Sequence, residues 1–307
     1  MSAVFLVFLF MSIPTLQAQT ILPSATGSDL QDIPKPMSAR EQEQLLRFTE
    51  IGLQWIAGQI TFDDVTRHLG KPQYQSEQID LVKYAYYQEG VMSIYFIYNK
   101  LKLVDGKPGI DSFSIKISDD IHTNIPYERF ESLGLHRLVR GESIDGVRIE
   151  QGDFFVPVEV ADASRFYPEN FFGFNYRLPM PPDSLFDVYV GLGYLGEWRD
   201  QGGGEAKLSK VRKAVDLRNL GISRHYLTPE ELEQRHLAKR QKYGMMDLRT
   251  GMVCPETGLW ESWTQAGIVG KAVVRAGDRF KPHLRLDMPP AEVRWMWSGE
   301  YRPERLA

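Results

Sequence analysis

The sequence predicts an α+β protein, in which helices are followed by antiparallel β-meanders and a small all-β module ends the chain. Three observations predict this class: two capped helices within residues 38–70, alternation of apolar and polar residues from residue 79, and four tryptophans beyond residue 250. Apolar residues three or four apart indicate a helix, whereas a period of two indicates a half-buried strand. The 307 residues are 43% hydrophobic and 25% charged, which is ordinary for a globular protein.

An apolar run, AVFLVFLFMSIPTL, occupies residues 3–16 and is followed by a small residue, Ala18. This pattern is typical of a signal peptide, so we expect residues 1–18 to be removed. Residues 19–37, rich in Pro, Ser, Gly and Asp, would then form a flexible tether. A membrane anchor is the alternative, but the run is short for a span of roughly 20 residues. We therefore expect a periplasmic protein whose mature chain has no integral membrane span.

The first predicted helix begins at a capping box made by Ser38 and Glu41, in which two N–H groups are satisfied reciprocally. Apolar residues follow at helical spacing, which predicts an amphipathic helix over residues 39–58. Thr61 is the expected cap of a second, shorter helix that stops at Gly70.

Two alternating segments, IDLVKYAYY (79–87) and VMSIYFIYN (91–99), follow these helices. The three residues between them end in Gly90, which indicates a hairpin in which we expect Tyr87 to pair with Val91. A third strand is expected at residues 111–118. Because side chains alternate along a strand, the apolar residues of all three would share the face that packs on the helices.

The opposite face of this sheet is polar with interleaved tyrosines, and two interpretations stay open for it. It is either a solvated sheet face or a surface that binds an acidic partner, with tyrosines as anchors and lysines steering the encounter. A glycine-rich loop expected at residues 191–204 supplies a further aromatic contact. The candidate partner-binding residues are Lys83, Tyr87, Tyr95, Lys116 and Trp198.

A weak internal repeat predicts that the first unit is duplicated. ITFDDVTRHLG (60–70) is similar to IPYERFESLG (125–134), and strand-like segments follow both. We therefore expect an α+β domain over residues 38–226, with subunits at about 38–118 and 119–200 that form a degenerate tandem repeat. A helix capped by Thr228 and ended by Gly244 is expected to connect it, over residues 227–245, to a small β module at 246–307.

The residues that could carry catalysis or bind a metal form no recognisable motif. The single cysteine, Cys254, is followed by a proline and has no helix start behind it to stabilise a thiolate. No zinc-ligand spacing, serine nucleophile motif or phosphate-binding loop is present. We therefore predict no catalytic, metal or cofactor-binding residues, and a buried structural thiol beside Trp260 and Trp295.

Two resemblances add to this interpretation. ITFDDVTRHLGKP, followed by a meander, resembles the β-lactamase-inhibitor-protein-like fold over residues 60–118, with a degenerate copy from 125. That group includes small outer-membrane assembly lipoproteins. The tail is similar to a C-terminal module of exported proteins encoded beside type VI secretion effectors, which implies an immunity protein. The residues that match its T-G-x-x-C-P-x-[ST]-G-x-W pattern are Thr250, Gly251, Cys254, Pro255, Thr257, Gly258 and Trp260.

The expected function is therefore to bind and block a cognate effector directed at the cell wall or at lipid, without catalysis. A net charge of −4 and the lack of a basic motif give no indication of a nucleic-acid partner. One alternative is an envelope assembly or scaffolding protein of the same fold. The other is a hydrolase whose residues are scattered and form no known motif.

Overall fold

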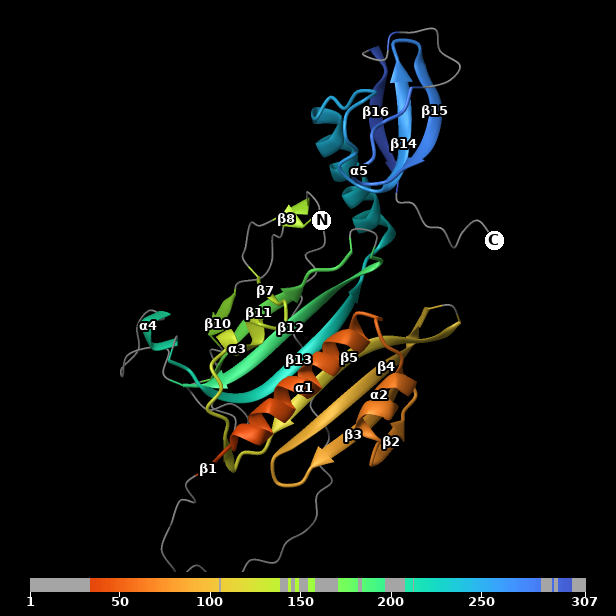
Figure 1. Cartoon of the computed structure of the whole chain (residues 1–307). Helices are drawn as coiled ribbons and strands as arrows, with labels where there is room; N and C mark the ends of the chain where they lie inside the picture. Colours follow the sequence, from red (N-terminus) through yellow and green to blue (C-terminus); the bar gives the residue numbers. More distant parts are fainter. Residues whose placement is uncertain are drawn as a thin grey trace, which may run out of the picture. The chain divides into compact units, whose positions relative to one another are not determined.

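The computed structural model describes residues 34–104, 106–138, 143–144, 147–148, 154–157, 171–181, 184–196, 208–211, 213–282, 289 and 292–299. Helices cover one face of a nine-stranded antiparallel sheet, and a three-stranded antiparallel sheet forms near the C-terminal end (Figure 1). The predicted α+β class is therefore confirmed. The expected signal peptide, residues 1–18, and Trp198 lie outside the described residues.

The two N-terminal helices begin where their sequence signals predict, and α1 ends at Ile56, two residues before the predicted end. α1 (Ala39–Ile56) begins at the Ser38–Glu41 capping box, and α2 (Phe62–Leu69) begins at Thr61, whose side chain accepts from the N–H of Asp64. Gly70 follows α2 with φ of 82°, a conformation that glycine adopts without steric cost. These ends are local interactions, which explains why the sequence predicts them.

The large sheet consists of two antiparallel meanders joined at their fourth strands. The strand order is β10-β11-β12-β13-β5-β4-β3-β2, and β7 also pairs with β11. At the centre β5 pairs with β13 in antiparallel register, with Phe113 opposite Ile222. The first meander comprises β2 (Tyr74–Glu77), β3 (Leu81–Gln88), β4 (Met92–Val104) and β5 (Lys107–Ile117). The second comprises β10 (Phe155–Pro157), β11 (Phe171–Leu178), β12 (Phe186–Leu195) and β13 (Asp216–Tyr226).

Shorter elements connect these strands. The parallel pair β1–β6 places the start of the described chain beside the end of the first meander, with Pro36 opposite His122. The remaining short elements are β1 (Lys35–Pro36), β6 (Ile121–His122), α3 (Glu128–Glu131), β7 (His136–Arg137), β8 (Ser143–Ile144), β9 (Val147–Arg148) and α4 (Leu208–Val211).

The repeated sequence segments occupy equivalent positions in the two meanders. Phe62 packs on Tyr84 of β3 with ring centroids 4.3 Å apart, and Tyr127 packs on Phe174 of β11 at 4.1 Å, both tilted by 32°. Each segment ends at a glycine in the left-handed region, with φ of 82° for Gly70 and 79° for Gly134. The two meanders therefore form one continuous sheet, and the fourth strand of the second meander runs to Tyr226.

The β3–β4 hairpin differs from the sequence prediction by two residues. Tyr87 lies opposite Ser93, not Val91, and the loop is Glu89-Gly90-Val91. Gly90 has φ of 66°, and the N–H of Val91 donates to the Gln88 carbonyl at 2.9 Å, so the three-residue turn closes one position later than predicted. A shift of two preserves the side-chain alternation, so the predicted assignment of residues to the two faces is correct.

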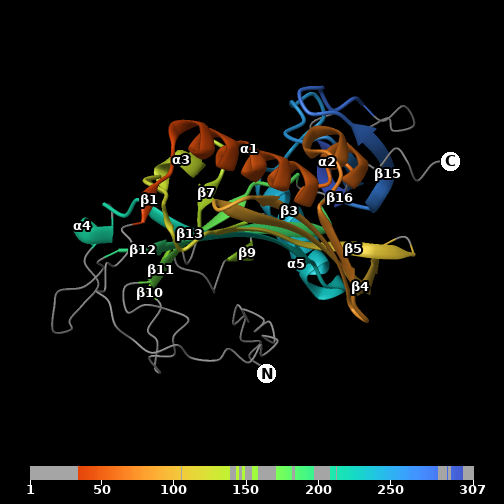
Figure 2. The same ribbon diagram turned by 90° about the horizontal axis from the view of Figure 1, so that it is seen from below.

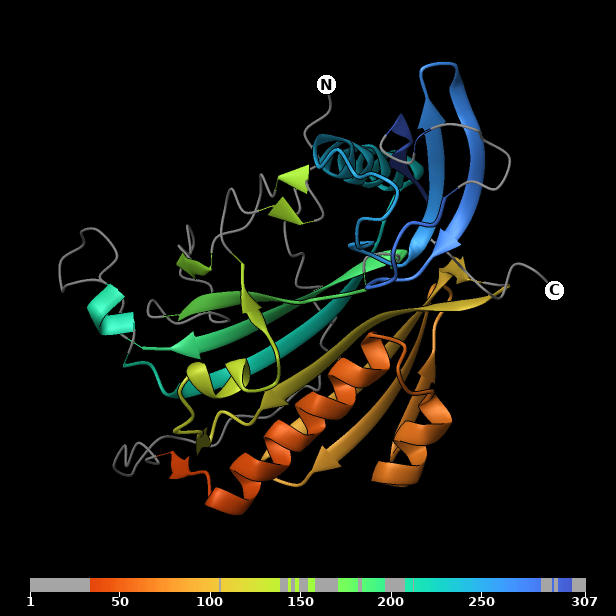
Figure 3. The same cartoon turned by 45° about the horizontal axis from the view of Figure 1, so that its top comes forward.

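The core lies between α1 and the centre of the large sheet (Figure 3). Trp55 packs edge-on against Phe96 at 5.1 Å, and Phe96 packs against Phe113 at 4.9 Å. Gly52 of α1 lies directly on the Phe113 ring, because a Cβ at this position would be 2.5 Å from a ring carbon. Arg224 of β13 donates to the carbonyl of Ile56 and so caps the end of α1. The helix therefore contacts strands of both meanders.

The C-terminal module contains a helix that the sequence predicts as a connector. α5 (Pro229–Met245) begins at the predicted Thr228–Glu231 capping box and packs against β16, so it is part of the module. Lys239 binds Glu256 at 2.6 Å, with its side chain only 8% exposed. The strand order is β15-β14-β16, with β14 (Gly258–Thr264), β15 (Gly267–Val274) and β16 (Arg294–Gly299).

Cys254 occupies the buried structural position that the sequence predicts. It is 1% exposed and belongs to the same hydrophobic cluster as Trp260 and Trp295. Its Sγ donates to the carbonyl of Glu256 at 3.0 Å, and burial raises the pKa of the thiol. A raised pKa lowers the thiolate fraction, which is the opposite of what an activated nucleophile requires.

Candidate binding face of the large sheet

The face of the large sheet opposite α1 carries the candidate partner-binding residues and is called the helix-free face below. In Figure 2 the sheet bends away from α1 toward both ends, so the helix-free face is its hollow side. Alternation along the strands places Lys83, Tyr87, Tyr95 and Lys116 on this face, opposite the buried residues Tyr86, Ile94 and Ile115.

Three of the candidate residues form a cluster in contact. Lys83 Nζ lies 3.8 Å from the centroid of the Tyr95 ring, and the Tyr95 and Tyr87 rings are 6.5 Å apart at 85°. Tyr87 is 45% exposed, so much of its ring is available to a partner. Burial lowers the pKa of Lys83, and burial followed by the nearby Tyr95 and Tyr74 raises the pKa of Tyr87. This cluster, Lys83, Tyr87 and Tyr95, is called the tyrosine–lysine cluster.

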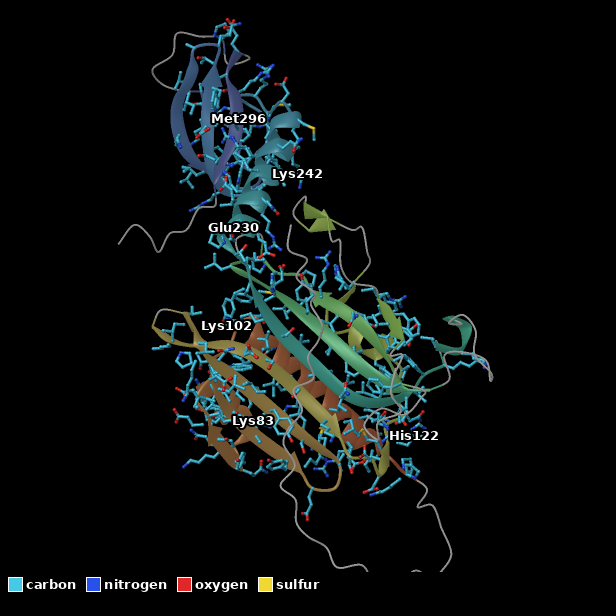
Figure 4. The ribbon with its side chains drawn as sticks, turned by 180° about the vertical axis from the view of Figure 1, so that it is seen from behind. Lys83, Lys102, His122, Glu230, Lys242 and Met296 are labelled. Atoms are coloured by element: carbon cyan, nitrogen blue, oxygen red, sulfur yellow. The ribbon has the colours of Figure 1, made fainter. Side chains whose placement is uncertain are left out.

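Lys116 is on the same face but outside this cluster. It is exposed and lies opposite Ser93 of β4, which in turn lies opposite Tyr87 of β3. Two strand spacings separate Lys116 from Tyr87, or about 10 Å. The structure thus places four of the five candidates on one face, while Trp198 lies outside the described residues. Lys83 is labelled in Figure 4, which views the sheet from this side.

Small residues form the centre of the helix-free face, a feature that the sequence analysis missed. Ser114, Gly221 and Gly191 lie opposite one another on three neighbouring strands. Gly193 accommodates Phe171, whose Cζ would be 2.4 Å from a Cβ at that position. The prediction of a glycine-rich loop from residue 191 is wrong at its start, because β12 continues to Leu195. Glycines alternate with apolar residues in VGLGYLG, and that period of two was the available signal.

Ion pairs occupy the opposite end of this face, where α5 begins. Arg235 of α5 donates to Asp187 of β12, and both side chains are largely buried. The hydroxyl of Tyr189 lies 3.5 Å from the same carboxylate, and burial, assisted by Asp187, raises its pKa to about 12. His225 Nε2 lies 3.4 Å from Glu231, whose carboxylate also accepts the N–H of Thr228 at 2.8 Å. These contacts connect α5 to the sheet.

Two features are absent from the part of the chain that the structure describes: a cluster of metal-binding side chains and a membrane-spanning helix. Among the described residues, no group of three or more His, Cys, Asp or Glu side chains could hold a metal ion. None of the helices in this part of the chain is long and apolar enough to cross a membrane. The helix-free face thus carries tyrosines and lysines at one end, small residues at its centre and ion pairs at the other end.

The chain matches no known protein family, no curated protein and no solved structure. The resemblances to the β-lactamase-inhibitor-protein-like fold and to the module of exported immunity proteins therefore stay predictions. What is known of the functional site comes from the residues of this chain and their geometry.

Proposed function

We propose that this protein is a periplasmic immunity protein that binds and blocks a type VI secretion effector. The observation that carries the proposal is the tyrosine–lysine cluster on the helix-free face. The exposed ring of Tyr87 lies beside Tyr95, and Tyr95 already packs against the ammonium of Lys83. The similarity of residues 250–260 to a module of exported immunity proteins supports the class of partner.

The geometry of the cluster suits a binding anchor. Tyrosine brings a large contact area with few rotatable bonds, so fixing it costs little conformational entropy. The ammonium of Lys83 over the Tyr95 ring restrains both side chains before a partner arrives. Lys116 stays exposed and steers an acidic partner surface more than it adds to affinity. The Ser and Gly residues beside the cluster leave room for side chains of the partner.

The mechanism that follows is steric. A partner whose active cleft docks on the hollow face of the sheet is closed to its substrate, without any covalent step. An effector directed at the cell wall or at lipid would be delivered to the periplasm, so a periplasmic protein would meet it there. Signal-peptide removal near Ala18, checked by N-terminal sequencing of the fractionated protein, is part of this proposal.

Alanine substitution of the tyrosines tests the proposal. Tyr87→Ala and Tyr95→Ala should each weaken binding to the effector encoded by the adjacent gene by about 2 kcal/mol or more, about thirtyfold, because buried aromatic anchors dominate interfaces. Trp198→Ala tests the second predicted contact in the same way. The measurement is isothermal titration calorimetry with the purified effector, after co-purification has established the pair.

Leu237→Ala is the matched control, because Leu237 is 53% exposed on α5, away from the cluster. It should bind within twofold of the parent. If both tyrosine variants also bind within twofold while keeping the circular dichroism of the parent, the helix-free face is not the interface.

The duplicated helix-and-meander sheet also favours a second candidate, an envelope assembly or scaffolding protein. The paired contacts Phe62–Tyr84 and Tyr127–Phe174 support the resemblance to the group that includes such proteins. Co-purification separates the two functions. Recovery of envelope assembly components, with no binding to the neighbouring effector, supports the scaffold.

A further inference from the structure

A fourth long side chain borders the tyrosine–lysine cluster, and it comes from the edge strand of the large sheet. Ala85 of β3 is on the helix-free face, yet it is 0% exposed. Tyr95 lies opposite Ala85 on β4, and Tyr74 lies opposite it on β2. Lys83 and Tyr87 precede and follow Ala85 on the same face of β3. These four long side chains surround Ala85, which accounts for its burial.

Tyr74 is held beside Tyr87 by its neighbour in sequence. The side chain of Gln73 accepts the N–H of Tyr87 at 2.9 Å and donates to the Tyr87 carbonyl at 3.2 Å. The N–H of Gln73 donates to the carbonyl of Ala85 at 3.0 Å. Tyr74 is 50% exposed, and after burial and Tyr95 it contributes to the raised pKa of Tyr87. Because β2 is the last strand of the sheet, the tyrosine rings continue to the sheet edge.

Lys83 is a partly buried cation without a carboxylate partner in the described part of the chain. Burial lowers its pKa, and no carboxylate offsets that effect. Glu77 of β2 lies opposite Val82, on the face that packs on the helices, and binds Lys100 at 2.6 Å. Asp111 of β5 pairs with a different lysine, at 3.4 Å.

Two further acidic residues lie in the turns at the ends of β3. Asp80 precedes the strand and Glu89 follows it. At about 3.3 Å per residue they are roughly 10 and 20 Å from Lys83 along the chain. The charged residues on the helix-free face of β3, β4 and β5 beside the cluster are therefore both cations, Lys83 and Lys116.

This arrangement offers hydrogen-bond donors but no anion. An ammonium group has three donors and no acceptor, and each phenol has an O–H to donate. A partly buried charge is costly unless it is paired. A carboxylate that reaches Lys83 therefore gains a charge-assisted hydrogen bond in a setting partly shielded from water by the tyrosine rings. The rings supply contact area for the rest of the side chain that carries the carboxylate.

We propose that the tyrosine–lysine cluster and Tyr74 together receive an Asp or Glu side chain of the effector, whose carboxylate pairs with Lys83. This inference rests on the proposed function and specifies the chemistry of the partner at that site. Tyr74 is then a third aromatic anchor, and the interface includes the edge strand β2.

Ser76 offers a direct test, because it lies opposite Lys83 on β2. Ser76→Glu places a carboxylate of this chain beside the ammonium, so Lys83 is already paired and the added negative charge repels the carboxylate of the partner. Isothermal titration calorimetry with the purified effector should show at least tenfold weaker binding. Ser76→Gln has a side chain of the same length without the charge, and it should bind within threefold of the parent.

Tyr74→Ala should also weaken binding at least tenfold. Gln75→Ala is its matched control, because Gln75 is exposed on the same strand but on the opposite face, and it should bind within twofold of the parent. A double-mutant cycle identifies the partner group. Lys83→Met, combined with alanine variants of the surface Asp and Glu residues of the effector, should identify one carboxylate whose removal costs at least tenfold less affinity in the Lys83→Met background.

The proposal is overturned if Ser76→Glu and Ser76→Gln bind equally well, if Tyr74→Ala binds as the parent does, or if no carboxylate couples to Lys83. The proposed function stands in that case, provided that Tyr87→Ala and Tyr95→Ala still weaken binding. If those two variants also bind as the parent does, the proposed function fails as well. Circular dichroism of each variant should match the parent, because β2 is an edge strand and its substitutions leave the core intact.

Discussion

Glu261 is a carboxylate whose side chain is only 6% exposed and receives donors from several elements. Arg240 of α5 and Lys271 of β15 each lie 2.9 Å from it. Trp263 Nε1 and Ser298 Oγ each donate at 3.0 Å. Burial alone would raise the pKa of this carboxyl group, but these donors outweigh burial and lower it from 4.5 to about 2.

The C-terminal module should therefore lose stability in acid. A carboxyl group with a lowered folded-state pKa contributes stability that is present above its unfolded pKa of 4.5 and is lost as the pH falls to about 2. The shift is worth about 3 kcal/mol. Urea unfolding at pH 7 and pH 3 should show a loss of about 2 kcal/mol of this stability, because pH 3 still lies above the folded-state pKa. Glu261→Gln should show a smaller loss between these pH values than the parent. An equal loss in both proteins would assign the acid sensitivity to other groups.

At the residue scale, the sequence predicts what depends on near neighbours. The caps at Ser38, Thr61 and Thr228 are confirmed because each involves residues three positions apart. The buried position of Cys254 is confirmed as well. The donors around Glu261 were not predicted, because three of the four, Arg240, Lys271 and Ser298, come from α5, β15 and β16 and meet Glu261 only when the module folds.

Among the elements, α1 approaches the sheet closely at Gly52. Gly52→Ala should destabilise the protein by about 1–3 kcal/mol, because the new methyl group would overlap the buried Phe113 ring. A loss of stability would be specific to this close contact, because Gly→Ala on an exposed helix face raises the free energy of unfolding by about 1 kcal/mol. The midpoint and slope of urea unfolding followed by circular dichroism measure the difference.

Gly244→Ala in α5 is the control for this prediction. A Cβ there would lie 3.3 Å from Cε of Met296, the flexible end of a long side chain that can move aside. We expect a change within about 0.5 kcal/mol of the parent. Stabilisation by Gly52→Ala would mean that α1 lies farther from β5 than the structure shows.

The helices and the faces of the first meander could be predicted, whereas the register of the β3–β4 hairpin and the last part of β12 could not. Alternation shows which residues share a face, but it does not fix the pairing. Gly90 can be the last or the middle residue of a three-residue loop, and the two loops pair Tyr87 with Val91 or with Ser93. The segment at 191–195 was assigned to a loop because glycine disfavours strands. In the structure β12 pairs with β11 and β13 on both sides, and this pairing overrides the weak local preference.

Over the whole molecule, the continuous sheet should unfold as one cooperative unit. Ile94→Val in β4 and Ile222→Val in β13 each remove one buried methylene, at a cost of about 1 kcal/mol. Because β5 and β13 are hydrogen-bonded, each variant should lower hydrogen-exchange protection in both β3 and β11. Mass spectrometry of peptides from these strands measures it. A loss confined to the meander that carries the substitution would show that the two halves unfold independently.

The union of the two meanders could not be predicted from the sequence. The repeat at 60–70 and 125–134 indicates a duplication, but two copies can pack as separate units or share a sheet. Whether the two copies share a sheet depends on backbone hydrogen bonds between β5 and β13. Every residue type except proline can form such bonds, so the sequence does not indicate this pairing. The candidate face was found in part for the same reason: its tyrosines and lysines lie within the first meander, while its Ser and Gly centre spans both meanders.

The junction between β5 and β13 also bears on how fast the protein folds. Phe113 and Ile222 are 109 residues apart (222 − 113), whereas neighbouring strands of the first meander are joined by short turns. Contacts between residues so distant in sequence slow folding, because a long loop must close before they form. Until residues 216–226 arrive, β5 has an unpaired edge and the sheet stays incomplete. The pairing of β5 with β13 is therefore expected to be a late step in folding.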